Sequence, residues 1–307
     1  MKRRDFLKKS VGAGLFAGSL VTLGGYGRIF ANTTNNAALP YDLVAVKDGQ
    51  PEKMFDRAME AMGGMRKFVK PNQTVVVKPN IGWDVIPEKA ANTNPALVKR
   101  IIEQCFEAGA KKVYVFDHTC DDWQKCYKNS GIEKAAKDAG AKVAPGHTEG
   151  YYEEVKIPQG EKLTKAKEHE MILESDVFIN VPILKNHGSA RLTVAMKNLM
   201  GIVWDRRFWH RNDLHQCIAD FASYRKPDLN VVDAYRVMLR NGPRGVSTAD
   251  VSTMKYQIVS DDMVAADTSA AKIFGTSPEK VRHIKIAGNA GYGEMELSKL
   301  KIGRFKL

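Results

Sequence analysis

The sequence predicts an α/β protein with a doubly wound, mostly parallel sheet that is covered by helices on both faces. Short apolar segments rich in Val and Ile alternate along the chain with longer amphipathic segments, which is the order of βαβ units. The apolar segments are also too continuous for strands with one face in water, since such strands alternate apolar and polar residues.

The elements are expected in the order that this alternation gives. Strand 43–47 is the first apolar run, and the Met-rich segment 51–68 follows it as an amphipathic helix. Strand 74–78 holds three consecutive valines and stops at Pro79, which has no N–H for a central ladder. The remaining predictions are helix 95–109, strand 112–117, helix 131–139, a strand around 142–143, strand 177–181, helix 208–223, strands 229–233 and 256–260, helices near 264–274 and 278–288, and a last strand around 300–302.

Residues 146–170 interrupt the βα alternation. The segment is charged, rich in Glu and Lys, and contains the pattern Tyr151-Tyr152-Glu153-Glu154-Val155. We expect a small β insertion here, in the form of a hairpin or an edge strand.

Residues 1–31 have the pattern of a twin-arginine signal peptide. Arg3 and Arg4 belong to a basic N-terminal segment, and an uncharged stretch rich in small residues follows over 10–27. The alternative is an uncleaved membrane anchor, which the six glycines of this stretch disfavour. We therefore expect a folded protein that the twin-arginine translocase carries to the periplasm, with no permanent membrane span.

The charge of the chain favours a small anionic ligand over nucleic acid. The whole chain has a net charge of +12, and the first 31 residues hold six Lys or Arg and one Asp. That leaves about +7 on residues 32–307, which we expect to form a single domain. The remaining cations alternate with acids, as on a solvated surface, and form no basic stripe.

The four cysteines predict at most one disulfide. Cys120 and Cys126 are close in sequence in an exported chain, so a disulfide across this loop is expected. Cys105 and Cys217 lie on apolar helix faces and are expected in the core. The chain has no CxxC pair and therefore no local ferredoxin-type iron–sulfur motif. A cluster shared between subunits through Cys120 or Cys126 remains the alternative.

Polar residues follow most of the predicted strands. The carboxyl ends of strands in open α/β sheets form the ligand crevice, so these side chains are expected to converge there. The alternative is that each one caps the next helix. The residues are Lys78, Asn80, Asp117, His118, Asn180, Lys185, His187, Asp233, Tyr235 and 260–262.

Five separated motifs give the chain a resemblance to a known family. They are Val76-Val77-Lys78-Pro79-Asn80, 176–188, 195–201, 241–245 and 262–267. In this order they resemble the DUF362 family of prokaryotic proteins, from about residue 74 to the C-terminus. The Lys-Thr-His of that family corresponds here to Lys185-Asn186-His187. Many members carry ferredoxin-type cysteine motifs, which imply redox chemistry, and this chain has none.

Each chemical role has its candidate residues. Lysine, arginine and amide side chains bind carboxylates and phosphates, imidazole titrates near neutral pH, and carboxylates bind hard divalent ions such as Mg²⁺. The alternative for the carboxylates is a buried ion pair or a helix cap. The candidates for catalysis are Lys185 and His187. Those for substrate binding are Lys78, Asn80, Asn180, Lys197, Asn198, Arg206 and Arg244, with Arg206 or Arg207 on a lid that meets the substrate. Those for a divalent metal are Asp117, His118, Asp233, Asp262 and Asp267.

Two functions remain open at this point. The first is an exported enzyme that acts on a small anionic substrate at the carboxyl ends of the strands, by redox, lyase, isomerase or hydrolase chemistry. The second is a periplasmic accessory protein without catalysis, which binds a ligand or matures a cofactor. No cofactor beyond a divalent metal follows from the residues, and neither does an oligomeric state.

Overall fold

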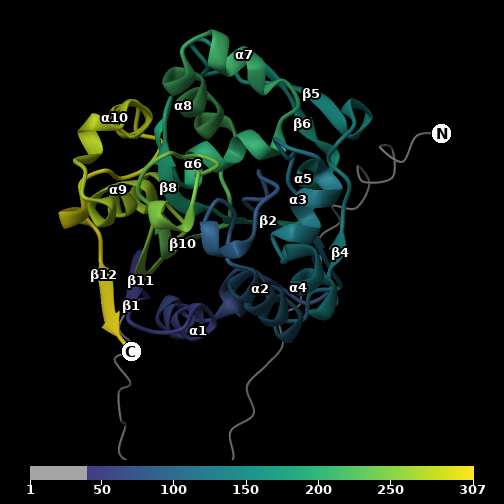
Figure 1. Cartoon of the computed structure of the whole chain (residues 1–307), viewed down its shortest axis with the longest axis vertical. Coiled ribbons are helices and arrows are strands. Elements are labelled where there is room, and N and C mark those ends of the chain that lie inside the picture. The colour runs from purple at the N-terminus through teal and green to yellow at the C-terminus, as the bar shows by residue number, and fades with distance from the viewer. Residues whose placement is uncertain (1–39) are drawn as a thin grey trace, which may run out of the picture. The chain divides into compact units, whose positions relative to one another are not determined.

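The computed structural model describes residues 40–307, which belong to one compact unit (Figure 1). A ten-stranded sheet runs through it in the order β12-β1-β11-β10-β7-β2-β3-β4, with β8 and β9 attached beside β10. The α/β fold class predicted from the sequence is confirmed. The strands are β1 (Leu43–Lys47), β2 (Thr74–Pro79), β3 (Lys112–Val115), β4 (Lys142–Val143), β7 (Val177–Val181), β8 (Ile183–His187), β9 (Arg191–Thr193), β10 (Leu229–Met238), β11 (Val251–Ser260) and β12 (Ile302–Lys306).

The strands from β10 to β4 are parallel, as the sequence predicts. Val76 of β2 lies between Phe178 of β7 and Tyr114 of β3 in the register of the sheet. Val75, Val76 and Val77 are all fully buried. Both faces of β2 are therefore covered, which explains its continuous apolar sequence.

The other side of the sheet is partly antiparallel, which the sequence analysis did not predict. Strands β10 and β11 form a long hairpin, β1 pairs antiparallel with β11, and β12 pairs parallel with β1. Both hairpin strands have ten residues, twice the predicted length. The connection 239–250 contains only a short 3-10 turn, whereas a parallel crossover normally contains a helix.

Helices cover both faces of the sheet. Met54, Leu97 and Ile132 pack with Val75 and Val77 on one face, while the second core lies on the face to which Val76 points. This alternation along β2 is the period of a strand. The first face carries α1 (Pro51–Met62), α2 (Pro95–Glu107) and α4 (Ile132–Asp138), and the second carries α6 (Ala195–Asn198), α8 (Leu214–Tyr224), α9 (Met263–Phe274) and α10 (Arg282–Asn289).

Two predicted helices are shorter than expected. Helix α1 ends before Gly63, which adopts a left-handed φ of 95° that favours glycine. The helix predicted over 208–223 is divided into α7 (Arg206–Arg211) and α8, because Asp213 caps a new helix through the N–H of Gln216.

The insertion predicted at 146–170 is a separate two-stranded hairpin. Strands β5 (Tyr152–Lys156) and β6 (Lys165–His169) pair antiparallel, and α5 (Glu170–Glu174) follows. Figure 1 places this hairpin beside α7, and Glu168 forms an isolated bridge with Val203. Across residues 40–307 no helix has both the length and the hydropathy that a membrane span requires. The predicted signal peptide lies outside the described residues.

Candidate functional site

Lys78 and Asp117 form a buried ion pair where β2 and β3 end. The Nζ atom of Lys78 lies 3.0 Å from Oδ1 of Asp117, and both side chains are almost fully buried. The other carboxylate oxygen accepts a hydrogen bond of 2.6 Å from the N–H of Ile81. Burial lowers the pKa of Lys78, and the charge of Asp117 opposes that change. A Cβ on Gly201 would lie 1.8 Å from Oδ1 of Asp117, so the pair requires glycine there.

Two asparagines, Asn198 and Asn80, connect Lys78 to Lys185, and a third, Asn180, holds Asn198. Oδ1 of Asn198 accepts hydrogen bonds of 2.9 Å from Nζ of Lys78 and from Nδ2 of Asn80. Nδ2 of Asn198 donates to Oδ1 of Asn180 at 2.8 Å. Oδ1 of Asn80 accepts a bond of 3.1 Å from Nζ of Lys185. Elements β2, β3, β7, β8 and α6 thus bring together the lysine–asparagine network, which consists of Lys78, Asn80, Asp117, Asn180, Lys185 and Asn198.

Two further amines differ in their surroundings. Lys185 is 1% exposed and also donates to the carbonyl of Ala91, and burial lowers its pKa to about 7. Lys197 is only partly buried, and its amine has no hydrogen bond or ion pair within residues 40–307. Burial lowers the pKa of Lys197 to about 8, with a further contribution from the charge of Arg206. Lys197 therefore supplies an unpaired amine near its titration point at neutral to weakly alkaline pH.

Arg206 and Cys120 act electrostatically on this amine. Arg206 donates bonds of 2.7 Å to the carbonyls of His118 and Thr119. The same guanidinium lies 3.6 Å from Sγ of Cys120, which is exposed. After burial, Cys120 and Arg206 are the groups that act most strongly on the pKa of Lys197.

A cavity of about 890 Å³ opens at Arg206 and Cys120. Its walls are the β5–β6 hairpin and the segment 203–209. The ring of His118 stacks on Trp204 at 4.9 Å and forms part of the lining. The volume suits a small-molecule ligand. Arg206, which the sequence analysis assigned to a lid, lines this cavity.

The predicted disulfide is wrong. Both Cys120 and Cys126 are free. Cys126 lies on the inner side of α3 (Trp123–Asn129), where its thiol is buried and lies 3.8 Å from the carbonyl of Gly82. Cys120 instead faces Arg206 from an exposed loop. Closeness in sequence did not bring the two sulfur atoms together.

Three of the predicted metal-binding carboxylates hold the backbone. Asp262 caps α9 and accepts bonds of 2.8 and 3.0 Å from two of its N–H groups. Asp267 accepts a bond of 2.6 Å from the N–H of Ala195, and Asp233 one of 2.8 Å from the N–H of Asn94. Burial raises the pKa of Asp233 to about 6 and that of Asp267 to about 8. Asp267 thereby positions α6, which carries Lys197 and Asn198.

The predicted metal site is therefore wrong. Asp117 belongs to the ion pair with Lys78, and Nδ1 of His118 lies 3.0 Å from the carbonyl of Val203. Within residues 40–307 no three His, Cys, Asp or Glu side chains are grouped so that they could hold a metal ion. The predicted metal ligands that do not lie together are Asp117, His118, Asp233, Asp262 and Asp267.

Two other predicted residues lie apart from the lysine–asparagine network. His187 lines a different cavity of about 520 Å³, and its Nδ1 accepts a bond of 3.1 Å from the N–H of Ala190. Burial and nearby lysines lower the pKa of His187 to about 2. Arg244 is mostly exposed and lies 3.4 Å from Asp121. Its place is on the surface of the loop, outside the lysine–asparagine network.

Two residues of the site were missed in the sequence. Asn230 of β10 accepts a bond of 3.0 Å from Nδ2 of Asn180 and extends the amide chain across the sheet. Gly201 gives space to the ion pair. The sequence did contain a signal for each, since Asn230 is a polar residue inside an apolar strand and Gly201 follows Asn198 by three residues. Both were missed because neither residue carries a charge.

The chain shows similarity to several known proteins. A thylakoid-associated protein of Synechocystis is 25% identical over 231 residues, which are 73% of this chain and 70% of that protein. The lactate racemase apoprotein of Thermoanaerobacterium thermosaccharolyticum aligns with a TM-score of 0.44 and 13% identity, over 69% of this chain and 53% of that one. A structural-genomics protein of Thermotoga maritima aligns with a TM-score of 0.47 and 12% identity, over 79% and 60%. The chain thus spans less than two thirds of these two solved structures.

The family match covers most of the sheet and the whole lysine–asparagine network. Residues 75–272 match the domain of unknown function DUF362. This range begins in β2, before Lys78, and ends in α9, after Asp267. The chain belongs to the DUF362 family.

Proposed function

We propose that this protein is an exported enzyme that transfers a proton to or from a small anionic substrate. The observation that carries the proposal is the unpaired amine of Lys197, whose pKa is lowered to about 8 by burial and by the charge of Arg206, a residue that lines the cavity. A base with a pKa near the working pH is suited to proton transfer. A carboxylate or phosphate of the substrate would be bound by the guanidinium of Arg206.

The lysine–asparagine network has a supporting role in this proposal. Lys185 is enclosed by Asn80 and the carbonyl of Ala91, so its amine positions Asn80. Asn198 is fixed by Lys78 and Asn180 and holds the helical turn that carries Lys197. Preorganised amides and cations of this kind stabilise charge that develops on a substrate. Catalysis by Lys185 itself and by His187 stays a prediction.

The test separates an enzyme from a binding protein. The purified protein is incubated in D₂O with pooled small carboxylates and phosphorylated carboxylates, and carbon-bound hydrogen exchange is followed by NMR. We expect exchange whose rate rises with pH through about 8, because only the neutral amine of Lys197 accepts a proton.

Two variants of one residue sharpen this test. Lys197→Arg keeps the positive charge but not the accessible neutral form, so ligand binding should persist while exchange is lost. Lys197→Gln should weaken both. Lys142→Arg, on exposed β4, is the matched control. Ligand binding without exchange in the unaltered protein would contradict the enzyme and favour a ligand-binding or cofactor-maturation accessory protein.

Export is the second part of the proposal. It is supported by Arg3 and Arg4 and by the uncharged stretch that follows them. Replacing both arginines by lysine should leave the protein in the cytoplasm when cells are fractionated. Periplasmic accumulation of this double variant at the unaltered level would contradict export by the twin-arginine translocase.

A further inference from the structure

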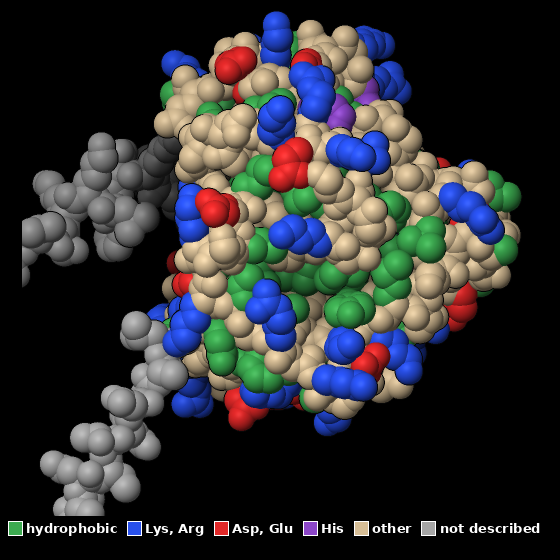
Figure 2. Space-filling model, turned by 90° about the vertical axis from the view of Figure 1, so that its left-hand side faces the viewer, with side chains coloured by type: hydrophobic (Ala, Val, Ile, Leu, Met, Phe, Trp, Pro, Cys, Tyr) green, Lys and Arg blue, Asp and Glu red, His purple; other side chains and the backbone are tan. Residues whose placement is uncertain are grey.

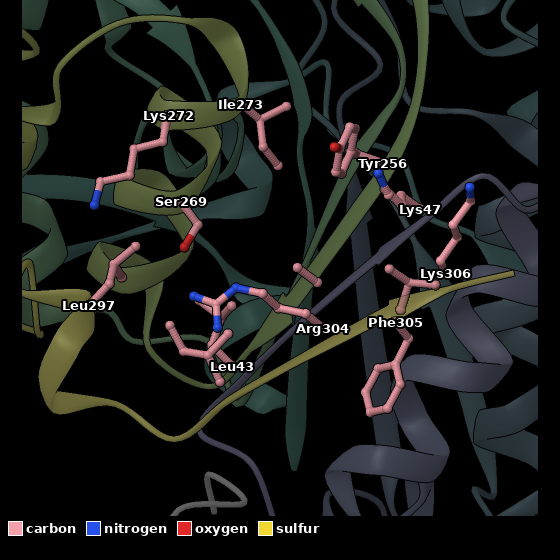
Figure 3. Close-up of a pocket in the computed structure, with 13 residues that line it drawn as sticks. Leu43, Lys47, Tyr256, Ser269, Lys272, Ile273, Leu297, Arg304, Phe305 and Lys306 are labelled. Atoms are coloured by element: carbon pink, nitrogen blue, oxygen red, sulfur yellow. The ribbon is translucent and has the colours of Figure 1, made fainter.

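The sheet edge formed by β1 and β12 is covered by helices on one face only. Val44 and Val46 of β1 face α1 and belong to its core. On the other face α9 packs over β10 and β11. A cavity of about 450 Å³ remains between α9, the 3-10 turn η8 (Leu297–Lys299) and the strands β1, β11 and β12 (Figure 3). We call this cavity the edge groove.

The walls of the edge groove are largely apolar. Leu43 of β1, Ile302 of β12 and Ile273 of α9 contribute aliphatic side chains, and Leu297 and Tyr256 complete the wall. Figure 2 shows the side of the molecule on which α9 and β12 lie, with hydrophobic side chains gathered in a hollow and Lys and Arg around it. Leu43 is buried and the other four wall residues are partly buried, so the apolar surface lies inside the hollow, as in small-molecule sites.

The charged residues at the edge groove are all cations. Lys47, Lys272, Arg304 and Lys306 line it, and the lining contains no Asp or Glu. Lys306 lies 3.7 Å from Asp48, outside the lining. Arg304 and Lys272 have no hydrogen bond and no ion pair to any side chain of the described part of the chain. Lys272 also acts on Glu279, whose pKa is lowered chiefly by a hydrogen bond from Ser277 and further by the charge of Lys272. Cations beside an apolar wall select a ligand with an anionic group and a hydrocarbon part.

Ser269 adds an independent observation. It is only 8% exposed and lies on α9. Figure 3 shows its hydroxyl pointing into the edge groove, toward the guanidinium of Arg304. Within residues 40–307 this hydroxyl has no hydrogen-bond partner, although buried polar groups are usually paired. This hydroxyl is therefore free to bond to a polar atom of a ligand in the groove.

We infer that the edge groove binds a single-chain amphiphile with an anionic headgroup, such as a fatty acid carboxylate. The headgroup lies between Arg304, Lys272 and the hydroxyl of Ser269, and the hydrocarbon chain lies along Leu43 and Ile302. The volume lies within the range of small-molecule pockets and suits an acyl chain of medium length. This site is separate from the cavity at Arg206 and does not depend on the proposed proton transfer.

Chain length and headgroup are tested first, by calorimetric titration of the purified protein with octanoate, decanoate and decanol. Affinity should rise about fourfold for each added methylene, because each buried methylene contributes a similar transfer free energy. Decanoate should bind at least about tenfold more tightly than decanol. No saturable binding, or equal affinity for decanol and decanoate, would overturn the inference.

Single substitutions then assign the parts of the groove. Arg304→Gln should weaken decanoate binding about tenfold and leave decanol unchanged. Lys142→Gln, which removes the same charge at the opposite sheet edge, should change neither. Ala45 shares the groove face of β1 with Leu43, so Ala45→Phe should abolish the binding of both ligands. Thermal unfolding checks that Ala45→Phe is folded. If Arg304→Gln binds decanoate as tightly as the unaltered protein does, that result alone overturns the inference.

The source of the amphiphile is tested with vesicles of phosphatidylglycerol and of phosphatidylcholine. If the protein cosediments with the anionic vesicles and free decanoate releases it from them, that result supports binding in the groove and identifies a membrane lipid as a source. Cosedimentation without any binding of soluble decanoate overturns the inference, because the cations then act as a surface patch. Lys197→Gln should bind decanoate as the unaltered protein does, which separates this result from the proposed function.

Discussion

Two clusters of cations in this protein are built in opposite ways. In the lysine–asparagine network Lys78 and Lys185 are enclosed, and each amine is bonded to amide, carboxylate or carbonyl oxygens. In the edge groove Arg304 and Lys272 are exposed and unpaired within the described residues. The first cluster changes the pKa of its amines through burial, and the second leaves its cations in contact with water.

The difference shows what a cation contributes in each setting. Removal from water makes protonation of a lysine costly, so buried amines become available for proton transfer at moderate pH. An exposed cation stays charged and adds little to stability, but it attracts an anionic ligand. The same residue type thus serves chemistry in one region and recognition in the other.

The largest expected effect comes from breaking the buried pair. Lys78→Met leaves the Asp117 carboxylate buried without its cation and should lower the free energy of unfolding by about 3–5 kcal/mol. Adding Asp117→Asn should restore part of that loss, because the amide keeps an acceptor for Ile81. Urea unfolding at constant pH measures both variants. A loss below about 1 kcal/mol for Lys78→Met would mean that the buried and the exposed cations contribute equally little to the free energy of unfolding.

The second effect tests the space around the same pair. Gly201→Ala places a Cβ against Asp117 and should destabilise the protein by about 1–3 kcal/mol. Gly150→Ala is the control, because a Cβ at Gly150 meets no atom within 4 Å. Equal urea midpoints for the two variants would contradict the packing of the ion pair.

The third effect is a pH dependence. The pKa of Lys185 falls from 10.5 to about 7 on folding. Between these values the unfolded chain holds a proton that the folded protein lacks, so stability rises with pH. The unfolding free energy of the protein relative to Lys185→Met should increase by about 2 kcal/mol from about pH 7 to pH 9. A flat difference would show that Lys185 stays protonated in the fold.

The smallest effect is expected in the edge groove. Arg304→Gln removes an exposed charge that has no ion-pair partner among the described residues, so the free energy of unfolding should change by less than about 0.5 kcal/mol. Urea unfolding without added amphiphile measures this. A loss above about 1 kcal/mol would mean that Arg304 supports the fold and would weaken the contrast with Lys78.

The sequence predicted the parallel part of the sheet better than its other side. Strands such as 74–78 and 177–181 are buried on both faces, and their continuous apolar runs are a strong signal. Strand β8 was missed because Lys185, Asn186 and His187 are polar, although Lys185 is enclosed by tertiary contacts. Pairing direction in the β10–β11 hairpin was also missed, because it depends on the conformation of the connection.

The candidate site was predictable in part. The rule that ligands bind at the carboxyl ends of strands grouped Lys78, Asn80, Asn180 and Lys185, and the structure joins these residues through hydrogen bonds that include Asn198. Their individual roles depend on burial and on hydrogen-bond partners, which a single sequence does not contain. The same limitation explains the metal prediction, since an aspartate such as Asp267 has the same sequence signal whether it binds an ion or a backbone N–H.

The two edges of the sheet bear on self-association. One edge is β4, with two residues, and the other is β12, with five, including the cations Arg304 and Lys306. Short edge strands and charged side chains hinder the addition of a strand from a second molecule. The edge strands of this ten-stranded sheet therefore hinder the growth of fibrillar aggregates, in which strands of further molecules would add to the sheet.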